Sequence, residues 1–354
     1  MTSKPLNPHD PDSNKPWKAQ APPPLVALVK RYIKGNNPLI ALVSAKQAEH
    51  KEAVQPANGI ILRQRLNDLP KVNAFLMELH AYIREGGYLF GCVETIQLRK
   101  KKLMASYPSP LNRLIYLAET LFKRAGARVA FLRPLYFRPG SGRSWPMWEI
   151  EVLGRLCACG YYPEETTESD GLLYFCARKL ATPSNFPKDR CGPIISLRRV
   201  GKRGKHFYMH KFRTMYPYSE YLQEYIFNNN GLQKGGKFKD DPRITHSGRF
   251  MRRYWIDEIP NLINLLKLEI KLFGLRPISD HYLSLYPESF QEQRKRFKPG
   301  MIPPEYVDRP KTIEEIVETE MRYIKAYERS PFLTDLKYTV RALYNIIVKK
   351  VRSK

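Results

Sequence analysis

The first half of the chain combines unbroken apolar runs with apolar residues at helical spacing. The runs Ile60-Ile61-Leu62 and Tyr88–Val93 show no polar alternation, which is typical of strands covered on both faces. Between them, apolar residues from Val72 to Leu79 recur at the spacing of one helix face. We expect Gly86-Gly87 to close that helix before the second strand begins. The pattern predicts an α/β module.

The rest of this module is predicted from the same two patterns. We expect a helix over 25–32, a strand over 38–43, a helix over 149–156 that ends at Cys159-Gly160, and a strand over 172–177. This order resembles the second half of a class I methyltransferase-like fold. The glycine-rich motif that would hold the methyl donor does not precede it. A degenerate accessory or docking domain is therefore favoured over an active methyltransferase.

The second half opens on a predicted basic hairpin. Two glycines interrupt the cations between Arg198 and Lys205, and a strand pattern resumes over 207–210. Further along, the adjacent carboxylates Asp257-Glu258 precede a helical run with one apolar face. The residues of that face are Ile259, Leu262, Ile263 and Leu266.

The position of Pro260 fixes where this helix begins. Because proline is tolerated only in the first turn, the helix starts near Asp257. Asp257 is then the N-cap residue or its neighbour, and Glu258 lies in the first turn, near the positive end of the helix dipole. Taken alone, the two carboxylates need no role beyond capping.

Two helices are predicted at the carboxyl end. Thr312 with Glu315 forms a capping box that opens a helix to about residue 327, and Ser330-Pro331 interrupts it. The last helix carries an apolar stripe with cations elsewhere. Such a helix can lie on an anionic membrane surface, or pack on the protein's own core; both interpretations stay open. The stripe consists of Leu333, Leu336, Val340, Leu343 and Ile347.

These elements divide the chain of 354 residues into segments. We expect a disordered tail over 1–24, a degenerate methyltransferase-like α/β domain over 25–180, and a proline-broken linker over 181–191. A mostly helical α+β module with a small β-hairpin follows over 192–310, and amphipathic helices over 311–354 complete the chain.

The composition limits the classes of molecule that the protein is expected to bind. The formal net charge of +26 favours an anionic partner, whether nucleic acid, a lipid surface or a phosphorylated substrate. Five cysteines and seven histidines lack the spacing of a metal site. The sequence shows neither a secretory leader nor an apolar run of roughly 18 residues. We expect a cytoplasmic protein, and attachment to the inner face of the cytoplasmic membrane through the last helix is a hypothesis.

Arginines cluster around the carboxylate pair in sequence. Arginine is the side chain best shaped for bidentate phosphate binding, and a helix N-terminus adds oriented N–H groups for an anion. The pattern therefore favours phosphate chemistry over capping alone. The arginines in question are Arg243, Arg249, Arg252, Arg253 and Arg276.

Five motifs in this region together resemble the bacterial sugar transferases, which are monotopic phosphoglycosyl transferases. The resemblance covers residues 192 to about 300. In order, the motifs are Lys211-Phe212-Arg213-Thr214-Met215, Asp241-Pro242-Arg243-Ile244-Thr245, Gly248-Arg249-Phe250-Met251-Arg252, Asp257-Glu258-Ile259-Pro260-Asn261 and Gly274-Leu275-Arg276-Pro277.

The resemblance implies a reaction and a set of roles. Such enzymes transfer a sugar-1-phosphate from a UDP-sugar to polyprenyl phosphate in exopolysaccharide, capsule or O-antigen-type assembly. Asp257 would be the nucleophile and Glu258 a ligand of Mg²⁺. The expected phosphate contacts are Lys211, Arg213, Arg243, Arg253 and Arg276.

The sequence also departs from the family. Residues 161–191 are polar and broken by prolines where members usually carry a hydrophobic helix that dips into the membrane, and Lys267-Leu268-Glu269 replaces the usual Lys-Gly-Asp. One alternative is a catalytically silent scaffold of a glycan-assembly system. The other, a nucleic-acid binder, lacks a recognisable reading element, so we expect no nucleic-acid partner.

Overall fold

The computed structural model describes residues 17–34, 40–43, 56–69, 71–118, 147–180, 192–230 and 241–349. The chain divides into two compact units. The first unit contains Met1–Cys191 and Met215–Arg243, and the second contains Gly192–Thr214 and Ile244–Lys354. The second unit thus starts where the sugar-transferase module was expected to start, but residues 215–243 group with the first unit. The expected linker over 181–191 lies outside the described residues.

Within the described residues, the first unit is built on a five-stranded sheet with the order β1-β2-β3-β5-β4. β1, β2 and β3 run parallel, and β5 pairs antiparallel with both β3 and β4. This topology confirms the predicted α/β class. The strands are β1 (Ile40–Val43), β2 (Ala57–Leu62), β3 (Ile83–Val93), β4 (Tyr161–Ser169) and β5 (Leu172–Lys179).

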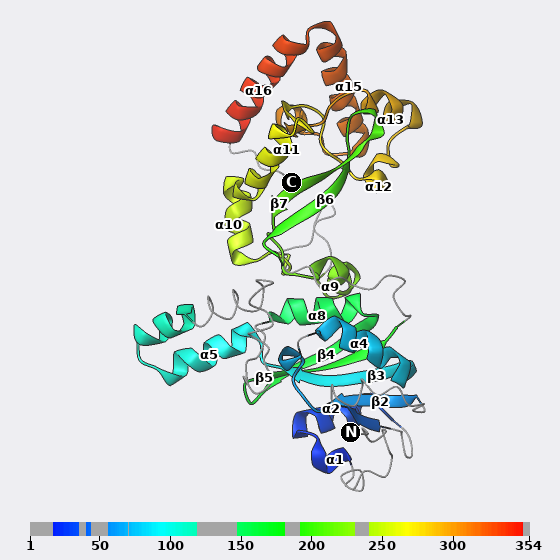
Figure 1. Ribbon diagram of the computed structural model, residues 1–354, viewed down its shortest axis with the longest axis vertical. Coiled ribbons are helices and arrows are strands. Elements are labelled where there is room, and N and C mark those ends of the chain that lie inside the picture. Colours follow the sequence, from blue (N-terminus) through cyan, green and yellow to red (C-terminus); the bar gives the residue numbers. More distant parts are fainter. Residues whose placement is uncertain are drawn as a thin grey trace, which may run out of the picture. The chain divides into compact units, whose positions relative to one another are not determined.

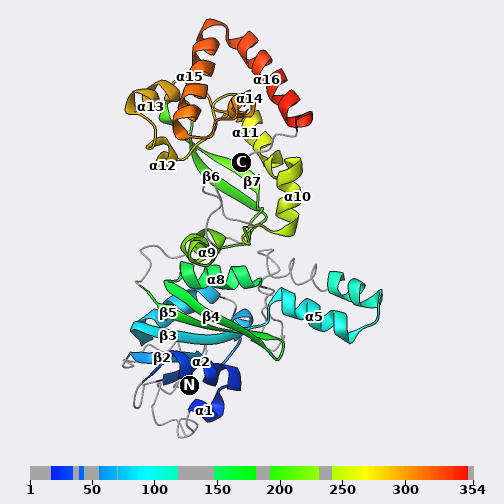
Figure 2. The same cartoon turned by 180° about the vertical axis from the view of Figure 1, so that it is seen from behind.

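Helices cover both faces of this sheet (Figures 1 and 2). Ile60 and Leu62 point into a core formed with α4 (Val72–Leu79) and α8 (Glu149–Ala158). Ile61, on the opposite face of β2, packs with α2 (Pro23–Tyr32). Burial on both faces explains why these strands lack alternation. Residues 17–24, expected in the tail, form α1 (Trp17–Gln20) and the first turn of α2.

The glycine pair lies elsewhere than the sequence predicted. The helix ends at Leu79 and a 3₁₀ turn, η2 (His80–Tyr82), follows, so Gly86-Gly87 is inside β3. A Cβ at Gly87 would lie 2.9 Å from the carbonyl oxygen of Asn58. The glycine therefore serves a close approach of β3 to β2, beside an irregularity in their register.

Residues 215–230 pack on the first unit. η4 (Ser219–Leu222) and α9 (Gln223–Asn230) contribute Leu222 and Ile226, which form a small core with Leu153 of α8. The Arg155 guanidinium of α8 lies 4.4 Å from the ring centre of Tyr218.

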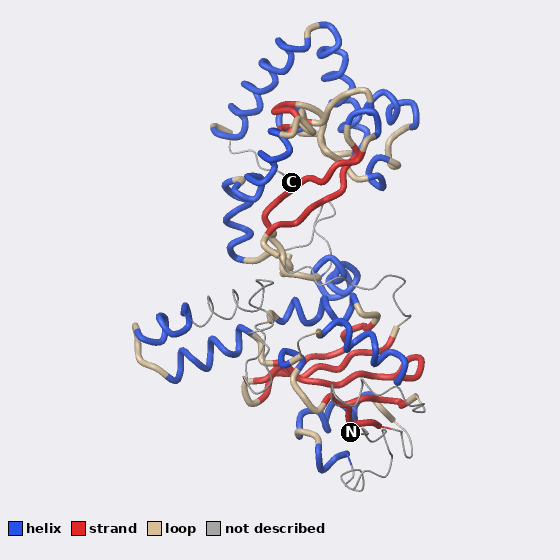
Figure 3. The backbone as a smooth tube through the Cα atoms, viewed as in Figure 1, coloured by secondary structure: helices blue, strands red, loops and turns tan. Residues whose placement is uncertain are grey.

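The second unit combines a β-hairpin with many helices, as predicted (Figure 3). The hairpin pairs β6 (Ile194–Val200) with β7 (His206–Phe212) through a turn that contains η3 (Lys202–Gly204). Short strands β8 (Lys271–Phe273) and β9 (Gly300–Ile302) run parallel to each other. The helices are α10 (His246–Tyr254), η5 (Ile256–Asn261), α11 (Leu262–Leu266), α12 (Asp280–Leu283), α13 (Glu288–Lys295), α14 (Glu305–Asp308), α15 (Ile313–Arg329) and α16 (Pro331–Ile347).

A buried ion pair crosses the core of the second unit. The Arg294 guanidinium of α13 binds both carboxylate oxygens of Glu320 on α15, at 2.8 and 3.2 Å. The two side chains are 4% and 0% exposed. Aromatic and aliphatic residues surround the pair, among them Tyr286, Phe290 and Ile324. Across the described part of the chain, no helix has both the length and the apolar character needed to cross a bilayer.

Candidate functional site

The carboxylate pair follows a sharp turn between two helices. α10 ends at Trp255, whose φ of 60° is left-handed, and Ile256–Asn261 then form the 3₁₀ turn η5 before α11 begins. Asp257 and Glu258 therefore lie in the first turn of a 3₁₀ segment whose N-cap residue is Trp255. The prediction that Asp257 is the N-cap residue or its neighbour is wrong by one position, and the α-helix starts only at Leu262.

Gly248 brings the preceding helix close to the hairpin. A Cβ at this position would lie 2.0 Å from the backbone carbonyl oxygen of Thr214. That carbonyl accepts a hydrogen bond from Thr245 N–H at 3.0 Å, and the Arg252 Nε donates to Thr214 Oγ1 at 2.9 Å. The motifs at residues 241–245 and 248–252 thus hold the start of α10 against the end of β7.

Glu258 is held by two side chains. The Lys211 ammonium, at the end of β7, forms an ion pair with Glu258 Oε1, and Asn261 Nδ2 donates to Glu258 Oε2. All three residues are buried or partly buried. The fold thus brings together a lysine and a carboxylate that are 47 positions apart in the sequence.

Asp257 is half-buried beside this pair. Burial raises the pKa of its carboxyl above the ordinary value, and the neighbouring charge of Glu258 raises it further. Lys211 and Arg252 act in the opposite direction. The carboxylate is therefore partly desolvated, with two cations close enough to affect its charge.

The other predicted phosphate contacts are dispersed. Arg213 donates to the carbonyl oxygen of Gly192 at 2.9 Å. Arg253 is exposed, with its guanidinium 5.8 Å from the ring centre of Tyr254, and Arg276 is exposed. Arg243 belongs to the first unit and forms an ion pair with Asp241 at 2.7 Å. Lys211, also one of the predicted cations, contacts the carboxylate pair directly.

Two side chains at the site and one further arginine of the second unit were not assigned from the sequence. Arg252 and Asn261 are part of the recognised motifs. The contact of Arg252 with Thr214 and that of Asn261 with Glu258 depend on the geometry of the turn between α10 and α11. Arg199 of β6 is half-buried, and its pKa is lowered by burial and then by the charge of Arg276.

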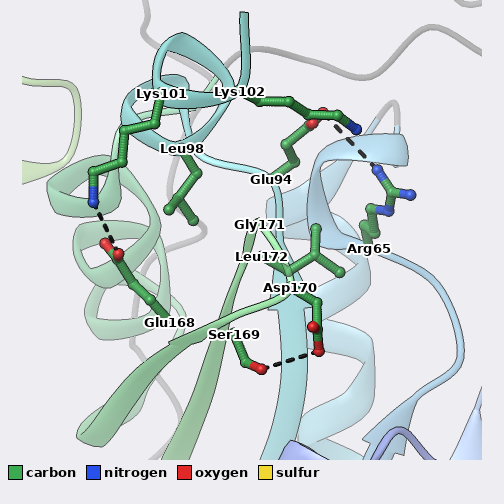
Figure 4. A pocket seen from close by; sticks show the side chains of 10 residues that line it. All are labelled: Arg65, Glu94, Leu98, Lys101, Lys102, Glu168, Ser169, Asp170, Gly171 and Leu172. Atoms are coloured by element: carbon green, nitrogen blue, oxygen red, sulfur yellow. Dashed lines mark hydrogen bonds and ion pairs between the residues drawn. The ribbon is translucent and has the colours of Figure 1, made fainter. Parts of the chain in front are cut away.

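A second candidate site lies in the first unit (Figure 4). A cavity of about 570 Å³ lies at the carboxyl ends of the parallel strands β2 and β3, where α/β proteins commonly bind ligands. Several of its charges pair within the protein: Lys101 with Glu168 at 3.1 Å and Arg65 with Glu94 at 3.9 Å. Arg99 also binds Glu94, at 2.8 Å. The lining residues are Arg65, Glu94, Leu98, Lys101, Lys102, Glu168, Ser169, Asp170, Gly171 and Leu172.

The second unit therefore presents a carboxylate pair with nearby cations on a mostly helical scaffold, an arrangement suited to a phosphorylated ligand. Residues 182–349 match the sequence model of the family described as bacterial sugar transferase. The match confirms the resemblance that the five motifs predicted, and it extends through both carboxy-terminal helices.

Curated relatives are similar over the same region. The galactosyl transferase CpsE of Streptococcus agalactiae is 36% identical over 145 residues, which are 40% of this chain and 32% of that protein. The undecaprenyl-phosphate galactose phosphotransferase of Salmonella typhimurium is 39% identical over 116 residues, which are 31% of this chain and 24% of that protein. The chain thus covers a third or less of the length of these two relatives.

Solved structures add little. A putative methyltransferase from Bacillus halodurans is matched over 44% of this chain and 99% of its own, with 12% identity and a TM-score of 0.27. A likeness this slight carries no argument about the first unit. Its α/β class is defined by its own strand order.

Proposed function

We propose that the second unit is a phosphoglycosyl transferase that moves a sugar-1-phosphate from a UDP-sugar to polyprenyl phosphate, in exopolysaccharide, capsule or O-antigen-type glycan assembly. The observation that carries the proposal is a half-buried Asp257 beside the Lys211–Glu258 pair, inside the segment that matches the family. The Salmonella relative is named for undecaprenyl phosphate and galactose phosphotransfer, which supports this substrate class.

The chemistry proceeds in two transfers. A carboxylate oxygen of Asp257 attacks the sugar-linked phosphorus of the UDP-sugar, and the bond to the bridging oxygen breaks to release UMP. The enzyme then carries an aspartyl-phosphosugar. A phosphate oxygen of polyprenyl phosphate attacks the same phosphorus, which regenerates the Asp257 carboxylate and gives polyprenyl diphosphate sugar.

The cations have a physical task in the first transfer. Two like unit charges 4 Å apart repel by about 4 kcal/mol at an effective dielectric near 20, so a carboxylate approaches a diphosphate only if positive charges offset the repulsion. Lys211 and Arg252 already act on Asp257. The charge of Arg276 also acts on Arg199, and an anionic phosphate would reduce the repulsion between two such cations.

Mg²⁺ is part of the proposal, and the residues present fit it. The ion takes oxygen ligands and commonly uses one or two carboxylates plus substrate phosphates. Besides the carboxylates of Asp257 and Glu258, the site holds Asn261 Oδ1, which is buried and without a hydrogen-bond partner among the described residues. Glu258 would be the ligand, and the ion would neutralise phosphate charge. Its binding would replace the contact between Glu258 and Lys211.

Intact-mass measurement tests the proposal. The purified chain is incubated with Mg²⁺ and a panel of UDP-sugars, without a lipid acceptor. We expect a mass increase equal to one sugar phosphate, and Asp257→Asn removes it. A correctly folded chain that gains no mass with any sugar would instead favour the catalytically silent scaffold.

A further inference from the structure

Trp255 links α10 to the turn that carries the carboxylate pair, and its backbone is left-handed, with φ of 60° and ψ of 17°. A bulky side chain rarely adopts this conformation, which persists only where surrounding contacts enforce it. Its N–H donates to the carbonyl oxygen of Met251, which ends α10, and its carbonyl oxygen accepts from Glu258 N–H at 3.1 Å. The conformation of this one residue therefore sets the direction in which the carboxylate pair leaves the helix.

A right-handed Trp255 would continue α10 instead of turning the chain. Because successive residues of an α-helix are rotated by about 100° around its axis, Asp257 and Glu258 would then follow the helix surface. Glu258 would lose the contacts with Lys211 and Asn261 that the 3₁₀ turn provides. The left-handed conformation is thus a condition for the geometry of the site.

An aromatic contact holds the Trp255 side chain. Its ring centre lies 5.0 Å from that of Tyr306 in α14, with the two ring planes at 54°. Tilted aromatic pairs at this separation are favourable, and both residues are partly buried. The contact favours the backbone conformation that brings the two rings together.

The two carboxy-terminal helices hold α14 in turn. Asn345 Nδ2 of α16 donates to the carbonyl oxygen of Tyr306 at 3.0 Å, and Arg322 of α15 forms an ion pair with Asp308 at 3.2 Å. Asn345 is buried on the inward side of α16, whereas the apolar stripe predicted from the sequence is exposed and is not packed on the protein's own core. Contacts therefore run from α16 through Tyr306 to Trp255 and the carboxylate pair.

We propose that Trp255 and Tyr306 are positioning residues: the Tyr306 ring holds Trp255 in its left-handed conformation, and this places the Asp257 carboxylate. The inference rests on the proposed function for the reaction that is positioned. The ring contact and the turn exist without substrate, so they can be measured separately. The proposal also gives α16 a part in the reaction, because Asn345 holds the backbone of Tyr306.

The rate of sugar-phosphate adduct formation, followed by intact mass at several UDP-sugar concentrations, tests the role of the rings. Tyr306→Ala should slow the maximal rate by about 10- to 100-fold, since a misplacement of about 1 Å can cost about 10² in rate. The UDP-sugar concentration at half-maximal rate should change little, because no phosphate contact is removed. Tyr306→Phe keeps the ring and should react at the wild-type rate. So should the control Tyr282→Ala, which removes a partly buried ring from a different aromatic pair of the second unit.

Substitutions at Trp255 test the backbone conformation apart from the ring. Trp255→Ala should be about as slow as Tyr306→Ala, because alanine has no ring and disfavours the left-handed region. Asparagine also lacks the ring but enters that region readily, so Trp255→Asn should recover most of the rate. Adding Tyr306→Ala to Trp255→Asn should then cost little more, because the two side chains no longer interact.

Three kinetic results would overturn the inference. A wild-type maximal rate in Tyr306→Ala excludes the role of the ring, and equal slowing in Trp255→Asn and Trp255→Ala excludes the backbone argument. A change confined to the half-maximal UDP-sugar concentration would assign the rings to substrate binding instead.

Hydrogen exchange without substrate separates this inference from the proposed function. Peptides that cover η5 should exchange faster in Tyr306→Ala than in the wild type or Tyr306→Phe, while α13 keeps its wild-type protection. This result is expected even if the wild-type chain forms no adduct with any sugar, which would refute the proposed function alone. Unchanged exchange of η5 in Tyr306→Ala would show that the ring does not hold the turn.

Discussion

The ion pair between Arg294 and Glu320 gives the sharpest stability prediction. Burial by itself lowers the pKa of the Arg294 guanidinium, but Glu320 outweighs this effect and leaves the pKa above its ordinary value. Glu320→Gln removes the countercharge and leaves a cation that is almost completely buried. Loss of one partner of such a pair costs about 3–5 kcal/mol. The second unit should lose that much of its free energy of unfolding.

An exposed pair on the same helix provides the matched control. Lys295 and Glu292 of α13 are 2.6 Å apart, but Glu292 is 73% exposed. Water screens such a pair, so Glu292→Gln should cost less than about 1 kcal/mol.

The assay must resolve the second unit by itself. Because two compact units can unfold separately, a single two-state fit is not valid for the whole chain. Hydrogen exchange followed by mass spectrometry reports local opening, and peptides from α13 and α15 cover both partners. If Glu320→Gln lowers protection there no more than Glu292→Gln does, the burial argument is refuted.

Further predictions concern pH, packing and the site. Burial raises the pKa of the Glu305 carboxyl from 4.5 to about 7, and the charge of Glu320 contributes in the same direction. The folded state therefore keeps a proton on this carboxyl at pH values where the unfolded state loses it. The free energy of unfolding should fall by at most about 3 kcal/mol as the pH rises from 4.5 to 7. Glu305→Gln should flatten this slope in urea titrations read by exchange in α15, and an unchanged slope would contradict the assignment. Gly248→Ala should increase hydrogen exchange in α10, because its Cβ would clash with a backbone carbonyl; wild-type protection would show that the close approach is not required. Lys211→Met should slow formation of the sugar-phosphate adduct by about 10²–10³-fold. The control Lys205→Met, at an exposed position of the hairpin, should leave this rate unchanged. Equal rates in both variants would exclude a role for Lys211.

Much of the fold was readable from local pattern. The buried strands, α4, α8, the hairpin and both terminal helices follow from periodicity, glycines and capping residues. Thr312 caps α15 as predicted, with its Oγ1 accepting from Glu315 N–H, whereas the Glu315 side chain accepts from the N–H of Lys311, one residue before the N-cap. Such signals involve neighbours within one turn, which is why a single sequence contains them.

What the sequence could not show depends on distant partners. The apolar stripe of α16 was found, but its orientation is decided by the carbonyls that Thr334 and Asn345 reach. Similarly, Asn264 turns inward because hairpin backbone groups more than 50 positions away need a partner. Periodicity identifies an apolar face, but it does not say whether the protein or its surroundings cover that face.

For the candidate site, the structure can be compared with the sequence only in which side chains lie together, and the roles of these residues stay predictions. The carboxylates and Lys211 were identified through the motifs, and they meet in the structure. The left-handed Trp255 and the 3₁₀ turn were missed, because neither has a distinctive sequence signal.

The return of residues 215–243 to the first unit has a consequence for synthesis on the ribosome. The chain passes between the units three times, at 191–192, 214–215 and 243–244. Leu153 of α8 obtains its partners Leu222 and Ile226 only after the hairpin has left the exit tunnel. The first unit therefore cannot complete its packing before part of the second has emerged, and a fragment cut at residue 192 would leave the Leu153 side of α8 uncovered.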